Sequence, residues 1–169
     1  MLIESRSAFM PYAPSAHPEP ELRAWVQNTL LSAGGVTVAT LNGAVVGVLA
    51  VSRQGGSSWI NQMWVTPSLV GKGIGSHLLR HALTILEPPI RLYTFQANSG
   101  ARRFYERKGF QAIEFADGQS NEERCPDVLF ELQFVVSESG GSQETPSKLQ
   151  NRIDDDHCRH EHGRQGPLS

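Results

Sequence analysis

The chain has 169 residues, enough for one domain with a substantial core. Hydrophobic residues make up 39% and charged residues 19%, both ordinary for a soluble globular protein. The formal net charge of -2 provides no basic field for nucleic acid, and no apolar run is long enough to cross a bilayer. The first residues also lack the apolar core of a signal peptide, so we expect a cytoplasmic protein that binds neither nucleic acid nor membrane.

The first half of the folded region reads as helices followed by an antiparallel meander. A proline-rich loop separates the two helices, and Asn42-Gly43 between two β-rich runs is a strong hairpin signal. The expected elements are helices at Leu2–Phe9 and Glu19–Leu31 and strands at Val36–Leu41, Ala44–Ser52 and Trp59–Val65.

The second half alternates strands and helices. An amphipathic helix follows the third strand and stops before Pro88-Pro89, and a second helix ends in basic residues and a glycine. The expected elements are helices at Gly73–Leu86 and Ser99–Lys108 and strands at Ile90–Phe95, Phe110–Phe115 and Val128–Val136. This order predicts an α/β fold with a mixed sheet: a meander followed by β-α-β-α-β-β.

The composition changes near Ser137. Residues 137–169 lack aromatic residues and periodicity, so they bury too little apolar surface to offset the entropy of ordering. We therefore predict a domain over residues 1–136 and a disordered polar tail over 137–169. The run from Asp154 to His162 lacks the ligand spacing of structural metal sites, and we expect no metal there.

Three glycines, Gly71, Gly73 and Gly75, connect the third strand to the helix after it. Glycine allows close backbone approach and positive φ, and the free N–H groups at a helix start suit a pyrophosphate. The turn alone fits a ligand-free connection equally well. The spacing GxxxxGK[ST] of a P-loop and the dinucleotide-binding GxGxxG are both absent.

Three segments, taken in order, resemble the GNAT superfamily of N-acetyltransferases. Trp64–Leu79 is similar to the family's strand, pyrophosphate loop ([QR]xxGx[GA]) and helix; Asn98–Phe110 is similar to its late helix and Gly-Phe; Asp117–Val128 carries a pattern of many bacterial members. The resemblance implies a GNAT-like sheet flanked by helices and acetyl-CoA as co-substrate. It also implies acetyl transfer to a primary amine by direct attack in a ternary complex.

The same resemblance assigns the coenzyme to two segments. In the family, a bulged strand pairs with the pantetheine arm, which maps to Met63–Val65, and the Val65 N–H would polarise the acetyl carbonyl. Asn98 would contact the coenzyme, although an asparagine there also suits a helix N-cap. The expected coenzyme-binding residues are Met63, Trp64, Val65, Val70, Gly71, Lys72, Gly73, Ile74, Gly75, Ser76, Asn98 and Tyr105.

Tyr105 is the expected general acid. It follows Asn-x-x-Ala-x-x-Phe, where it matches the family's catalytic tyrosine. A phenol, with a pKa of about 10, can protonate the departing thiolate. From the residue alone, packing of the last helix is the alternative interpretation.

The general base and the acceptor are left open. The third strand has no ionisable side chain, so a water-mediated route is the simplest hypothesis. Glu122, Glu123 and Asp127 favour a cationic amine, either on a small molecule or on a peptide or protein, while Arg124 argues against a purely acidic groove. Five ionisable residues lie in segments that can line the acceptor side, where a base would be needed: His17, Glu19, Glu114, Glu122 and Asp127.

Two features depart from the family pattern. Val70 stands where the family has Gln or Arg, and the chain begins about where the family's first helix should begin. A missing first strand would expose a sheet edge, which favours a homodimer. Both departures support an alternative function, a coenzyme A-binding module that senses or interacts without catalysis.

Overall fold

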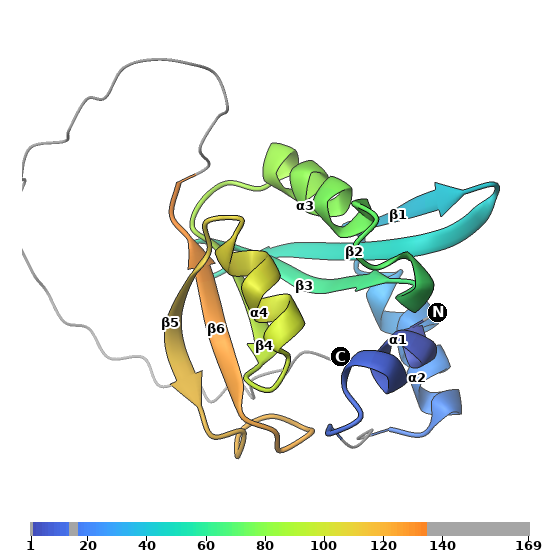
Figure 1. Cartoon of the computed structure of the whole chain (residues 1–169), viewed down its shortest axis with the longest axis horizontal. Coiled ribbons are helices and arrows are strands. Elements are labelled where there is room, and N and C mark those ends of the chain that lie inside the picture. Colours follow the sequence, from blue (N-terminus) through green and yellow to red (C-terminus); the bar gives the residue numbers. More distant parts are fainter. Residues whose placement is uncertain (1, 14–16, 135–169) are drawn as a thin grey trace, which may run out of the picture.

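The computed structural model describes residues 2–13 and 17–134 (Figure 1). The predicted polar tail, the run from Asp154 to His162 and the last two residues of the strand expected at Val128–Val136 lie outside these residues. Within the described part of the chain, no helix is long and apolar enough to cross a membrane.

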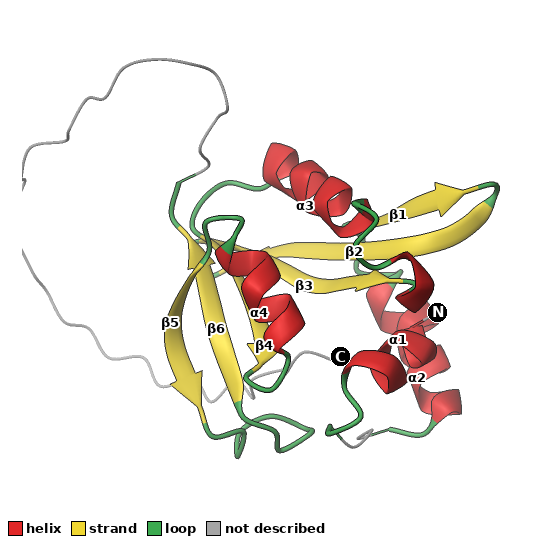
Figure 2. Ribbon diagram, viewed as in Figure 1, coloured by secondary structure: helices red, strands yellow, loops and turns green. Residues whose placement is uncertain are grey.

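A single six-stranded sheet forms the centre of the molecule, in the order β1-β2-β3-β4-β6-β5 (Figure 2). All neighbouring strands are antiparallel except β3 and β4, which are parallel, so the predicted mixed sheet is confirmed. The helices are α1 (Leu2–Phe9), α2 (Glu19–Trp25), α3 (Ile74–Ile85) and α4 (Ser99–Glu106). The strands are β1 (Val36–Leu41), β2 (Ala44–Gln54), β3 (Ser57–Val65), β4 (Ile90–Phe95), β5 (Gln111–Ala116) and β6 (Asp127–Leu132).

The second helix is shorter than expected. Its regular part ends at Trp25, and a π-helical turn, η1 (Val26–Leu30), follows, closed by a bond from the Leu31 N–H to the Val26 carbonyl. This wider turn keeps Leu30 buried but leaves Thr29 exposed.

The main core lies between the sheet and the helices α3 and α4. As predicted, the apolar face of α3 is turned inward and His77, Arg80, His81 and Thr84 are exposed. The buried members of this core are Leu49, Ile60, Leu78, Leu79, Ala82, Leu86, Ile90, Leu92, Tyr105, Phe110, Val128, Phe130 and Leu132.

A smaller apolar cluster covers the opposite face near the end of β3. Met10 and Ala13 pack there on Trp64 and Phe95. Because side chains alternate along a strand, Trp64 faces this cluster while Met63 and Val65 face α3. The N-terminal segment therefore covers one face of the sheet and α3 covers the other.

Gly47 on β2 lets α3 lie close to the sheet. A Cβ at this position would lie 2.9 Å from Leu78 Cδ1, 3.1 Å from Ile74 Cγ2 and 3.3 Å from the Trp64 carbonyl oxygen. Ile74 is the first residue of α3, so the start of this helix is fixed partly by the missing side chain.

We predict that Gly47→Ala lowers the free energy of unfolding by about 1–2 kcal/mol, because overpacking outweighs the entropy gained by removing a strand glycine. Urea denaturation measures this change. Gly100→Ala is the matched control: its Cβ would meet only Asn98 Oδ1, at an ordinary 3.7 Å. Equal stabilities of the two variants would show that α3 does not depend on Gly47.

Candidate active site

The gap between β3 and β4 is the centre of the candidate site. The two strands pair only at Ser58 with Ile90 and Trp59 with Arg91. Beyond this point β3 stays with β2, and β4 stays with β6, so the sheet opens between them (Figure 2). The facing edges of β3 and β4 are thereby released from the sheet.

The last residues of β3 direct backbone groups into this gap. The Thr66 N–H donates to the Val46 carbonyl on β2 over 2.9 Å. Successive N–H groups of a strand point to opposite edges, so the N–H groups of Met63 and Val65 point away from β2. The Val65 carbonyl accepts a hydrogen bond from Ser5 Oγ at 2.9 Å, which agrees with this direction. The Trp64 N–H, by the same alternation, is used by β2.

The strand bulge lies earlier than expected. The register with β2 passes from Gln62 to Ile60, which leaves Asn61 as the extra residue, so the assignment of the bulge to Met63–Val65 is wrong. The bulge allows Ile60 and Met63 to face the same core, which regular alternation would prevent.

The glycine loop presents a row of backbone donors at the start of α3. Gly73 is the N-cap, with φ +89°, and its carbonyl accepts from the His77 N–H. Among the described residues, the N–H groups of Ile74, Gly75 and Ser76 have no hydrogen-bond acceptor. Such a helix start binds anions well. Val70 and Lys72 on the same loop are exposed.

Asn98 is a helix N-cap. Its Oδ1 accepts the Ala101 N–H at 3.0 Å at the start of α4. Only the Nδ2 donors of this side chain are then left for a ligand. The alternative interpretation of Asn98 is therefore present in the structure and remains compatible with a contact to the coenzyme.

Tyr105 is part of the main core. It is 7% exposed, and its ring packs against Phe104, Phe110 and Phe130 at centroid distances of 5.2, 5.6 and 6.2 Å. Burial raises the pKa of its phenol above the ordinary value. The group therefore stays protonated at neutral pH, which suits a proton donor and excludes a base.

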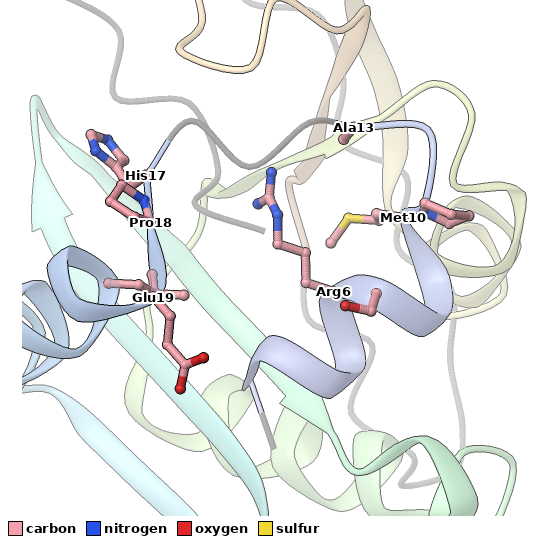
Figure 3. A pocket seen from close by; sticks show the side chains of 9 residues that line it. Arg6, Met10, Ala13, His17, Pro18 and Glu19 are labelled. Atoms are coloured by element: carbon pink, nitrogen blue, oxygen red, sulfur yellow. The ribbon is translucent and has the colours of Figure 1, made fainter.

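An apolar cavity of about 470 Å³ lies on the other face, between α1, the proline-rich loop and the start of α2 (Figure 3). Arg6 on α1 and Met10, just after this helix, lie on one side of it, and His17, Pro18 and Glu19 lie on the other. Tyr12, in the same loop, packs edge-to-face on Phe95 at 6.3 Å, so this segment reaches the end of β4.

An ion pair joins α1 to the loop between β5 and β6. Arg6 Nη1 lies 3.3 Å from Glu123 Oε1, and the two side chains are only 11% and 1% exposed. Sequence reasoning did not find Arg6, because nothing local distinguishes it from a surface arginine. Two sequence features could have pointed to this pair: Arg6 is the single basic residue of Leu2–Phe9, and the loop carries two adjacent glutamates, Glu122 and Glu123.

The five ionisable residues expected on the acceptor side have different surroundings. His17 bridges Glu21 and Glu122 over 3.0 and 3.2 Å, and these contacts raise its pKa. Glu19 pairs with Arg23, and Glu114 is exposed on the edge strand β5. Only Asp127 is buried, beside Asn121, whose Nδ2 donates to its Oδ2.

Comparison with solved structures shows the same fold in several acetyltransferases. YjaB from Escherichia coli, in its apo form, is 21% identical and aligns over 78% of this chain and 87% of its own, with a TM-score of 0.61. The PaiA N-acetyltransferase from Thermoplasma acidophilum, in complex with coenzyme A, is 19% identical and aligns over 78% of this chain and 87% of its own, with a TM-score of 0.57. Naa50 from Arabidopsis thaliana, bound to the bisubstrate analogue CoA-Ac-MVNAL, is 22% identical and aligns over 70% of this chain and 82% of its own, with a TM-score of 0.56.

Among curated protein sequences, none matches this chain significantly. The model of the acetyltransferase (GNAT) family, in contrast, matches residues 2–110, more than half of the chain. This range includes β3 and β4 on the two sides of the gap, the glycine loop and Tyr105. The chain belongs to the acetyltransferase (GNAT) family, whose enzymes use acetyl-CoA as co-substrate.

Proposed function

We propose that this protein transfers the acetyl group of acetyl-CoA to a primary amine, by direct attack in a ternary complex. The observation that supports this proposal is that two sets of unpaired backbone N–H groups follow each other along the chain. The first set lies on the edge of β3 that faces away from β2, and the second lies at the start of α3, after the glycine loop. One extended ligand with an amide-containing arm and a pyrophosphate satisfies both sets.

The proposed binding mode places the coenzyme along β3 and the loop. Met63 and Val65 bind the arm through backbone groups, and the Val65 N–H polarises the acetyl carbonyl. The loop from Val70 to Ser76 holds the pyrophosphate through N–H groups, with Lys72 adding positive charge. Trp64 makes no side-chain contact with the coenzyme, because its side chain is buried with Met10 and Phe95; this packing holds the end of β3 in place.

The chemistry requires a proton for sulfur and removal of protons from nitrogen. The amine lone pair attacks the acetyl carbon, a C–N bond forms and the C–S bond breaks. Tyr105, whose phenol is protonated at neutral pH, supplies a proton to the leaving thiolate. The acceptor enters from the face covered by α1, as a small amine or the amino group of a peptide or protein.

The alternative is a coenzyme A-binding module without catalysis. Val70, which is 52% exposed, offers no side-chain donor to phosphate, and Tyr105 makes the aromatic contacts of an ordinary core residue. Acetyl-CoA binding is common to both functions, whereas thiol release in the presence of amine is not. A panel of glycinamide, spermidine and the pentapeptide Met-Val-Asn-Ala-Leu tests the difference.

We also propose self-association through the edge strand β1, where Val38 and Leu41 are exposed. Sedimentation velocity over a range of protein concentrations measures it. A single monomeric species throughout would contradict a homodimer.

We predict that Gly73→Ala weakens acetyl-CoA binding roughly tenfold, because an alanine at φ +89° strains the loop by about 1–2 kcal/mol. Isothermal titration measures the change. Gly56→Ala is the control, since this hairpin glycine has φ +73° and lies at the opposite end of β3 from the loop. It should lower the thermal midpoint without changing the affinity. Equal affinities of wild type and Gly73→Ala would exclude the loop as the phosphate site.

We predict that Tyr105→Phe lowers the rate of acetylation about 100-fold and leaves acetyl-CoA affinity unchanged, because the ring remains while the proton donor is lost. Thiol release from acetyl-CoA measures the rate with the panel amine that reacts fastest. An unchanged rate in Tyr105→Phe would assign Tyr105 to the core alone.

A further inference from the structure

Two buried carboxylates on the acceptor side have too few partners. Glu123 Oε1 accepts from Arg6, but Glu123 Oε2 has no hydrogen-bond partner, although it is shielded from solvent. Asp127 shows the same pattern: Oδ2 accepts from Asn121, and the buried Oδ1 accepts from nothing within the described residues. Of the four oxygens of these two carboxylates, Arg6 and Asn121 therefore bind one each.

Such an imbalance calls for a further donor. A buried carboxylate oxygen without a hydrogen bond is strongly unfavourable, and native proteins rarely keep one without a purpose. A group of three or more residues able to hold a metal ion is not found in the described part of the chain. A primary ammonium has three N–H donors and one positive charge, which matches what Glu123 and Asp127 lack.

These carboxylates lie at the end of the sheet where the gap opens. Asp127 is directly opposite Phe95, the last residue of β4, and Phe95 packs against Tyr12. Glu123 is joined to Arg6, and the adjacent Ser5 binds the Val65 carbonyl. Val65, on one side of the gap, is thus bonded to α1, which also holds Glu123. Phe95, on the other side, is paired with Asp127.

We propose that Glu123 binds the ammonium group of the acceptor and takes up its proton before acetyl transfer. This inference rests on the proposed function. Arg6 retains Oε1, while Oε2 accepts the ammonium, and Asp127 supplies a second acceptor. One proton passes from nitrogen to Glu123, and the neutral amine attacks the acetyl carbon. The nitrogen loses its second proton as the tetrahedral intermediate collapses, and this proton restores the one that Tyr105 gives to sulfur. Glu123 then returns its own proton to solvent.

The surroundings of Glu123 suit this role. Burial raises the pKa of its carboxyl above the ordinary value, and Glu122 acts in the same direction, while the backbone N–H of Glu123 and the Arg6 guanidinium oppose the shift. The other titratable or charged groups on the neighbouring segments are Arg124, Cys125 and Asp127, which follow Glu123, His17, which bonds Glu122, and Tyr12, whose carbonyl accepts from Cys125. A glutamate whose pKa is raised above its ordinary value is a better base than a free one.

The test compares Glu123→Gln with Glu87→Gln, the same change of charge at an exposed residue whose backbone bonds Ser58 at the paired end of β3 and β4. We expect Glu123→Gln to reduce kcat/KM for the panel amines at least 100-fold while acetyl-CoA affinity stays within twofold. Glu87→Gln should keep at least a third of the wild-type value. Equal losses in the two variants, or no loss in Glu123→Gln, would overturn the assignment.

The pH profile of the wild type provides a second test, which does not depend on the folding of a variant. The rate should rise with pH along a limb set by Glu123, above the ordinary range of glutamate. Because glycinamide and spermidine differ in their own pKa values, a limb shared by both belongs to the protein. If the limb instead differs between the amines as their pKa values do, Glu123 is not the base.

The outcomes separate the two proposals. If the wild type binds acetyl-CoA but releases no thiol with any panel amine, the proposed function fails and this inference fails with it. If wild type and Glu123→Gln acetylate equally, only the role of Glu123 fails. A folded Glu123→Asp variant that keeps the shared limb but reacts more slowly would support it, because the carboxylate is retained but displaced.

Discussion

The early separation of β3 from β4 is the constraint on which the site depends. Only two residue pairs join these strands, and beyond them each strand keeps a neighbour on one side alone. Backbone groups that a closed sheet would consume are instead available to a ligand. The sheet remains stable because β2 and β6 continue the pairing on the outer sides, and because separate apolar clusters cover its two faces.

The helix α3 places its free N-terminal N–H groups beside the gap between β3 and β4. Its N-terminus lies where β3 ends, and the close approach permitted by Gly47 keeps it there. Positive φ values at Gly71 and Gly73 turn the chain sharply between strand and helix. In the proposed function, the backbone donors of β3 and the glycine loop come from one continuous stretch of chain, whereas the acceptor side is assembled from α1 and the β5–β6 loop, which are far apart in sequence.

This difference explains what could be predicted from the sequence. The glycine loop, the inward face of α3 and the hairpin at Asn42-Gly43 follow from local periodicity and turn chemistry, and each is present in the structure. The bulge at Asn61 and the π turn ending at Leu30 depend on tertiary packing and left no local signal. The Arg6–Glu123 pair spans 117 positions, so neither residue could identify the other.

Ser5 gives α1 a second role besides covering the sheet. Its hydroxyl holds the carbonyl of Val65, and the N–H of that same residue faces the gap. In the proposed function, an acceptor that displaced α1 would therefore move the residue that faces the coenzyme. Coupling between two binding events is reciprocal, so a coenzyme that ordered Val65 would equally order α1. The hydrogen bond from Ser5 would then couple the binding of the two substrates.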